Sequence, residues 1–247
     1  QAAFADAALQ QKLAAKCAAM LTSAATVEAR QFAAWQLSLL GASAEVPALA
    51  RALADPNLSY HARLALERIP GKQAQTARET ALASASGHLR VDLIGSLAAR
   101  GNDSAVPTLG GLVAASDPAT ATAALRALGR IGGGSASALL LAAEGKIPAA
   151  LEPEWSTALL QCAQRLLTTG NTPAALAILD RLTAPAAAPR IRLAAFPLRV
   201  QALGDRGADA VLSALASEDP AQQAAAIGAL RATANPGVLS AAADRVD

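Results

Sequence analysis

Apolar residues recur along the chain at the three- and four-residue spacing of helices, and they never form the strict alternation of a half-buried strand. In one expected helix the apolar face holds Phe32, Trp35, Leu39 and Leu40, and Gly41 marks the end of the helix. The pattern therefore predicts an all-α chain. It also places Phe32 and Trp35 in the core of that fold.

A second pattern repeats at roughly thirty-residue intervals, which indicates a stack of similar supersecondary units. An Asp-Pro pair is followed, at constant offsets, by two alanines and a leucine. The three copies are Asp55, Pro56, Ala62, Ala65 and Leu66; Asp117, Pro118, Ala124, Ala127 and Leu128; and Asp219, Pro220, Ala226, Ala229 and Leu230. A Val-Pro pair at Val46 and Pro47 also recurs sixty residues later, at Val106 and Pro107. Two signals with constant offsets predict an array of helix pairs.

The order Val-Pro, Asp-Pro, then Ala-x-x-Ala-Leu resembles the HEAT-repeat family, and most of all its short bacterial repeats, which also occur in phycobilin lyases. The resemblance covers residues 28–131 well and 208–230 adequately, whereas residues 134–203 lack the Asp-Pro turn. It implies a right-handed α-solenoid of about seven antiparallel helix pairs with a concave inner face.

The expected organisation is one continuous solenoid with four parts. These are an N-terminal capping helix in residues 1–26, regular repeats in 27–143, irregular repeats with longer loops in 144–205, and C-terminal repeats with a cap in 206–247. The first helix is expected over residues 4–21 and the last over 238–246. Pro197 lies inside an expected helix, which it should kink.

Composition narrows the classes of function. The chain has 21 basic and 19 acidic residues, so it lacks the excess of positive charge that phosphate binding uses, and we expect no nucleic-acid partner. We also expect no membrane span. The chain starts at Gln1, and 17 of its basic residues are arginine. These features favour an exported bacterial protein over a cytoplasmic one, or a piece of a larger chain or assembly.

Candidate chemistry is sparse. Cys17 and Cys162 lie in apolar helical patterns and are expected to be buried. His61 and His88 have no neighbours at the spacing of metal ligands, so the sequence predicts no metal, no cofactor and no catalytic residue. We therefore expect a non-catalytic scaffold rather than an enzyme. The resemblance leaves an alternative open, a HEAT-like enzyme or ligand carrier that handles a tetrapyrrole or acts on nucleic acid as a glycosylase does.

Candidate binding residues lie mainly where second helices begin, because these helices line the concave face in the family. Trp155 is added because it lies next to Pro153 in the irregular stretch, where the lapse in the repeat suggests a specific function. The candidates are Tyr60, His61, Arg90, Asp92, Trp155, Arg190 and Arg192. The sequence thus predicts that a protein partner, of unknown identity, binds on the concave surface.

Overall fold

The computed structural model describes residues 6–101, 103–232 and 240, and none of these residues is in a β-strand. The chain divides between Thr108 and Leu109 into two compact units, unit 1 (residues 1–108) and unit 2 (residues 109–247). This division falls within residues 27–143, which the sequence suggests are one run of repeats. The first residues of the expected N-terminal helix and nearly all of the expected helix at 238–246 lie outside the described residues.

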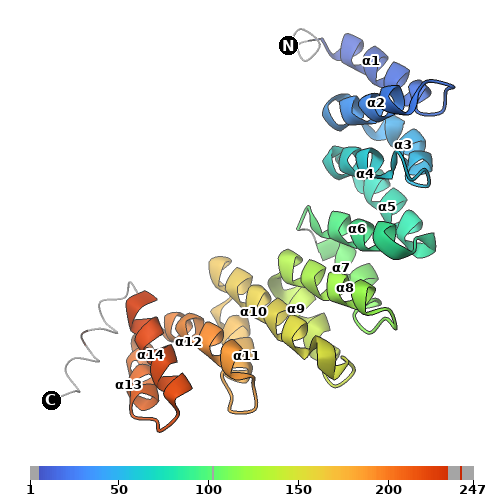
Figure 1. The fold of residues 1–247 in the computed structure, drawn as a ribbon. Coiled ribbons are helices and arrows are strands. Elements are labelled where there is room, and N and C mark those ends of the chain that lie inside the picture. Colours follow the sequence, from blue (N-terminus) through green and yellow to red (C-terminus); the bar gives the residue numbers. More distant parts are fainter. Residues whose placement is uncertain (1–5, 102, 233–239, 241–247) are drawn as a thin grey trace. The chain divides into compact units, whose positions relative to one another are not determined.

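Unit 1 is built from short helices joined by tight turns (Figure 1). Its elements are α1 (Ala7–Met20), α2 (Val27–Leu40), η2 (Ser43–Glu45), α3 (Val46–Ala52), α4 (Ser59–Arg68), α5 (Lys72–Ser84), α6 (Gly87–Ala98) and η3 (Asp103–Ala105). The next helix, α7 (Val106–Gly110), starts at the end of unit 1 and continues into unit 2.

Unit 2 is also built from consecutive helices joined by short links (Figure 1). Its elements are α8 (Pro118–Ile131), α9 (Gly133–Ala142), η4 (Ala149–Leu151), α10 (Glu152–Thr168), α11 (Thr172–Leu182), α12 (Pro189–Leu203), η5 (Gly204–Arg206), α13 (Gly207–Leu215) and α14 (Pro220–Ala232).

Within each unit, consecutive helices pack as pairs, and the even-numbered helices also pack on one another. In unit 1, α2 packs on α4 and α4 on α6; in unit 2, α8, α10, α12 and α14 pack in that order. The repeated sequence positions provide this packing, since Ala62, Ala65 and Leu66 are fully buried, as are Ala124 and Leu128. The all-α, solenoid-type fold predicted from the periodicity is confirmed.

The recurring Pro residues mark helix starts, as the sequence suggests. Pro47 lies in the first turn of α3, and Pro118 opens α8. In α8 the carboxylate of Asp117 accepts hydrogen bonds from the backbone N–H groups of Ala119 (3.3 Å) and Thr120 (3.1 Å). Such a cap satisfies two of the free N–H groups at a helix start. Asp219 likewise accepts from the N–H of Ala221 at the start of α14, whereas Asp55 accepts from the N–H of Asn57 in a turn that precedes α4. The second and third Asp-Pro copies therefore start helices, and the first forms a turn.

A buried arginine fixes α5 against α6, and no sequence pattern pointed to it. Arg78 is 1% exposed. Its Nη1 donates to the carbonyl oxygen of Ser96 at 2.7 Å and to the Ser96 hydroxyl at 3.3 Å, and its Nε donates to the carbonyl of Ala74 at 3.1 Å. Burial and the nearby Arg100 guanidinium lower the pKa of Arg78. These hydrogen bonds to carbonyl oxygens offset part of the desolvation cost of burying the cation.

The stretch of the sequence that lacks the Asp-Pro turn also forms helices. After α9 the chain makes turns and the short η4, and α10 then begins at Glu152, with Pro153 in its first turn. Helix α12 continues across Pro197 without interruption. Trp155 is therefore a residue of α10 and does not lie in a loop.

Candidate interaction surface

Large apolar side chains are exposed together on α2 and α4 of unit 1. Phe32 is 59% exposed, Trp35 is 42% exposed and Tyr60 is 58% exposed, and Leu39 is exposed as well. We refer to Phe32, Trp35, Leu39 and Tyr60 as the aromatic face. The prediction that Phe32 and Trp35 lie in the core is wrong.

The reason is that α2 is apolar on more than one side. Its buried side consists of small and aliphatic residues, namely Ala33, Ala34, Leu37 and Leu40. Phe32, Trp35 and Leu39 have helical spacing among themselves, so they form a second apolar stripe next to the buried one. The sequence pattern alone could not show which stripe faces the neighbouring helices.

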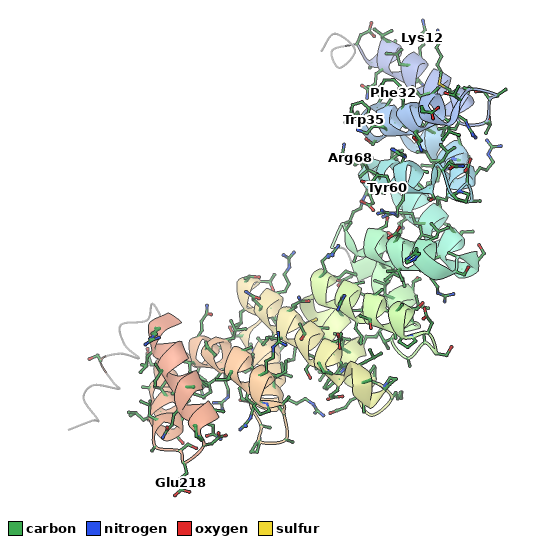
Figure 2. All side chains as sticks on the ribbon, viewed as in Figure 1. Lys12, Phe32, Trp35, Tyr60, Arg68 and Glu218 are labelled. Atoms are coloured by element: carbon green, nitrogen blue, oxygen red, sulfur yellow. The ribbon has the colours of Figure 1, made fainter. Side chains whose placement is uncertain are left out.

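The aromatic side chains contact one another and nearby charged groups. The rings of Phe32 and Trp35 have centroids 5.9 Å apart with a tilt of 39°. On α4, the Tyr60 ring meets the His61 ring edge-on at 5.2 Å, and the Arg63 guanidinium lies 5.5 Å from the Tyr60 centroid. In Figure 2 the labelled Phe32, Trp35 and Tyr60 lie along one side of α2 and α4, together with Arg68. The contacts hold large rings in place at the surface.

Trp155, by contrast, is a core residue. Its side chain is 4% exposed, and its indole Nε1 donates a hydrogen bond to the carbonyl of Leu140 at 2.8 Å. This bond fixes α10 against α9 and satisfies the polar atom of a buried tryptophan. We therefore withdraw Trp155 as a surface-binding residue, because no surface ligand can reach its ring in this conformation.

Arg192 has a structural partner that sequence reasoning missed. Its Nη1 lies 2.9 Å from Oδ2 of Asp219, in the third Asp-Pro motif. In unit 1, Arg30 forms the same kind of pair with Asp55 of the first motif, at 3.3 Å. The aspartate thus caps its own turn and binds an arginine of the preceding helix pair. The backbone N–H of Ala221, and then the Arg192 guanidinium, hold the pKa of Asp219 below its ordinary value.

The other candidates have different environments. Tyr60 and His61 are in contact, as described above. Arg90, at the start of α6, is half-buried and donates from Nη1 to the carbonyl of Ala85 at 3.3 Å. Asp92 on α6 and Arg190 on α12 are exposed. Only Tyr60 and His61 therefore belong to the region around the aromatic face.

Reactive groups do not gather elsewhere in the described part of the chain. Cys162 is buried, and burial raises the pKa of its thiol to about 12, whereas Cys17 is half-buried; both are free thiols. Across residues 6–101 and 103–232, no three His, Cys, Asp or Glu side chains lie close enough to bind one metal ion. Among these residues, no helix has both the length and the hydropathy needed to cross a bilayer.

Comparison with known proteins identifies the repeat type of one segment. Residues 74–146 match HEAT repeats. This match begins inside the region predicted from the sequence motifs and extends beyond it, to Lys146. No curated protein matches the chain. Among solved structures, an engineered protein, a target of the Northeast Structural Genomics Consortium, has a TM-score of 0.36 and 17% sequence identity, with 92% of this chain and 97% of that chain covered.

Proposed function

We propose that this chain is a protein-interaction module, and that a protein partner binds the aromatic face of unit 1. HEAT repeats are typically protein-interaction scaffolds, and residues 74–146 match such repeats. We also propose that the repeats are of the short bacterial kind, because the motif copies recur at about thirty residues. The partner contacts are made by side chains, and the helix pairs hold these side chains in place.

One observation carries the proposal: a chain with only 2% aromatic residues exposes three of them on two adjacent helices. Aromatic side chains are normally buried for their large apolar area, and a ring left partly in water forgoes a share of the roughly 1.5–3 kcal/mol that full burial provides. Tryptophan and tyrosine are also enriched among the residues that dominate binding energy at protein interfaces. The aromatic face is thus suited to be the centre of an interface.

Charge around the aromatic face is balanced, which supports a protein rather than a nucleic acid as partner. Arg63 is paired with Glu67 at 2.7 Å, and Arg30 with Asp55. Arg68 donates at 3.4 Å to the hydroxyl of Ser38 and has no acidic partner among the described residues. One unpaired cation beside three rings is typical of the edge of a protein interface, where arginine is favoured.

The test compares variants in quantitative affinity capture from the source organism, followed by binding assays with each purified candidate partner. The variant Phe32→Ser, Trp35→Ser, Tyr60→Ser removes the rings but touches no buried position. We expect it to lose the specific partner while keeping the helical signal and melting temperature of the parent.

The matched control is Ile227→Ser with Leu193→Ser, which removes two exposed aliphatic side chains from unit 2. This control should retain the partner. If a purified partner binds the parent, the triple variant and the control with the same affinity, then the aromatic face is not the binding surface. If no protein binds the parent specifically, the function itself is wrong.

A further inference from the structure

We propose that unit 2 contains a binding site for a small organic acid, in a cavity formed by α11, α12, α13 and α14. The cavity has a volume of about 420 Å³. Its lining residues are Asp180, Thr183, Ala184, Arg192, Phe196, Arg199, Ala210, Ser213, Ala214, Ala221, Gln222 and Ala225. This volume lies within the range of about 300–1,000 Å³ that is usual for sites of small ligands.

One face of α12 forms the centre of the cavity. Arg192, Phe196 and Arg199 are spaced by four and three residues, so they lie on the same side of the helix. At 1.5 Å of rise per residue, the two arginine positions are about 10 Å apart along the axis, with Phe196 between them. Phe196 also packs against the core of unit 2, which fixes one side of its ring and leaves the other toward the cavity.

Each arginine is held at its place by one aspartate. Nη1 of Arg192 lies 2.9 Å from Asp219, at the start of α14, and Nε of Arg199 lies 2.6 Å from Oδ1 of Asp180, on α11. The second ion pair leaves both terminal NH₂ groups of Arg199 without a hydrogen-bond partner among the described residues. These donors form a fixed planar fork of the kind that binds carboxylates in bidentate fashion.

The other open polar groups at the cavity, a hydroxyl and an amide, can each donate or accept a hydrogen bond. The hydroxyl of Ser213 and the amide of Gln222 make no hydrogen bond to another described residue. A ligand that fits this set offers an acceptor with a negative charge to Arg199 and an apolar, flat body to Phe196 and the surrounding alanines. An organic acid with an aromatic or short apolar body has both features.

A larger cavity in unit 1 lacks a charged group that could select one class of ligand. It has a volume of about 630 Å³ and lies along α3 and α5, but no charged side chain lines it. Its polar groups are hydroxyls and one amide, interspersed with alanines. The cavity of unit 2 is smaller, yet it contains both an aromatic ring, Phe196, and a guanidinium with free N–H donors, Arg199. This pair of groups determines the class of ligand that we propose.

The probe for the test is 3-phenylpropionate, with 3-phenylpropan-1-ol as an uncharged molecule of similar shape. Titration followed by protein NMR or calorimetry at low ionic strength should show saturable binding of the acid, with shifted resonances on α12. The alcohol should bind about tenfold more weakly, because a hydrogen bond to a charged partner is stronger than a neutral one.

Two substitutions in the cavity should change affinity in opposite directions. Arg199→Gln removes the guanidinium and should weaken binding of the acid about tenfold. Asp180→Asn keeps a side-chain oxygen that can accept from Nε of Arg199 but removes the negative charge that competes with the ligand. It should tighten binding roughly threefold, an increase that a folding defect would not produce. Arg130→Gln lowers the net charge by the same amount at an exposed position of α8, outside the cavity, and should leave the affinity unchanged.

The proposal is overturned if the acid and the alcohol bind equally, if Asp180→Asn weakens binding, or if the parent shows no saturable binding at millimolar acid. These outcomes are independent of the partner experiment, because the substitutions lie in unit 2 and the readout is the small molecule. Loss of one function leaves the other testable.

Discussion

Helices α2 and α8 have the same pattern of residues on their buried side and different kinds of residue on their outer side. Each has 14 residues, a side-chain cap before the first turn and a glycine at the end. When the two sequences are aligned with Thr26 opposite Asp117, the buried positions coincide. Ala33 corresponds to Ala124, Leu37 to Leu128 and Leu40 to Ile131.

The exposed positions of the same alignment differ in kind. Trp35 of α2 corresponds to Arg126 of α8, and Leu39 corresponds to Arg130. The two arginines are exposed, which is the ordinary composition of a solvated helix face. The stack thus requires only the buried positions, so an apolar residue at an exposed position contributes something other than packing. This is the physical basis for assigning binding to α2 rather than α8.

The largest expected effect on stability comes from placing a charge at the buried position that α2 and α8 have in common. Leu37→Asp and Leu128→Asp each place a carboxylate where the parent leucine is fully buried, without a cation to pair with it. We expect each to cost more than about 4 kcal/mol in the free energy of unfolding and to unfold more than one helix pair, because each repeat depends on its neighbours. Circular dichroism with thermal melting measures this effect. An unchanged melting temperature with full helical signal would show that the two positions are not equivalent core sites.

A smaller effect should come from the caps, which are also shared. Thr26 accepts a hydrogen bond from the N–H of Ala29 at 3.3 Å, and Asp117 accepts bonds from two backbone N–H groups. We expect Asp117→Ala to lower the free energy of unfolding by about 1–2 kcal/mol and Thr26→Ala by about 1 kcal/mol. Urea denaturation gives both values. Replacement of either residue by asparagine should restore most of the loss, and a failure to do so would mean that capping is not its role.

The difference between the helices is tested by transferring the α8 residue into α2. Trp35→Arg should change the free energy of unfolding by less than about 0.5 kcal/mol, since the position is exposed and arginine is a good helix former. The same change should abolish binding at the aromatic face. Leu37→Ala, two residues away, is the contrasting variant and should cost about 2–5 kcal/mol. A large loss of stability in Trp35→Arg would show that Trp35 packs in the core after all.

Much of this architecture follows from the sequence because its cause is local and repeated. Pro47 lies in the first turn of a helix, and Leu66 and Leu128 are buried at equal offsets, and both features can be inferred from spacing alone. The surface residues were harder to place. Phe32 and Trp35 have the spacing of core residues in the sequence, and their exposure in the structure is what assigns them to the outer side of α2.

Tertiary contacts account for the remaining errors. Trp155 is buried because the carbonyl of Leu140 and the neighbouring helices enclose it, although it follows a proline in an irregular stretch. Arg192 and Asp219 are 27 residues apart, and their ion pair depends on how one helix pair stacks on the next. Such pairings have no signal in a single sequence, except that the aspartates of the motif recur.

The two tryptophans provide a test that reports exposure directly and does not depend on a change in stability. Trp155→Phe leaves Trp35 as the single indole, which is 42% exposed, and its fluorescence should be red-shifted relative to that of Trp155 and more readily quenched by acrylamide. Trp35→Phe leaves Trp155, which is enclosed between α9 and α10, so its emission should be blue-shifted and protected from the quencher. When a partner binds the aromatic face, only the Trp35 signal should move to shorter wavelength. If both indoles are quenched equally, the difference in burial on which the aromatic face rests does not exist in solution.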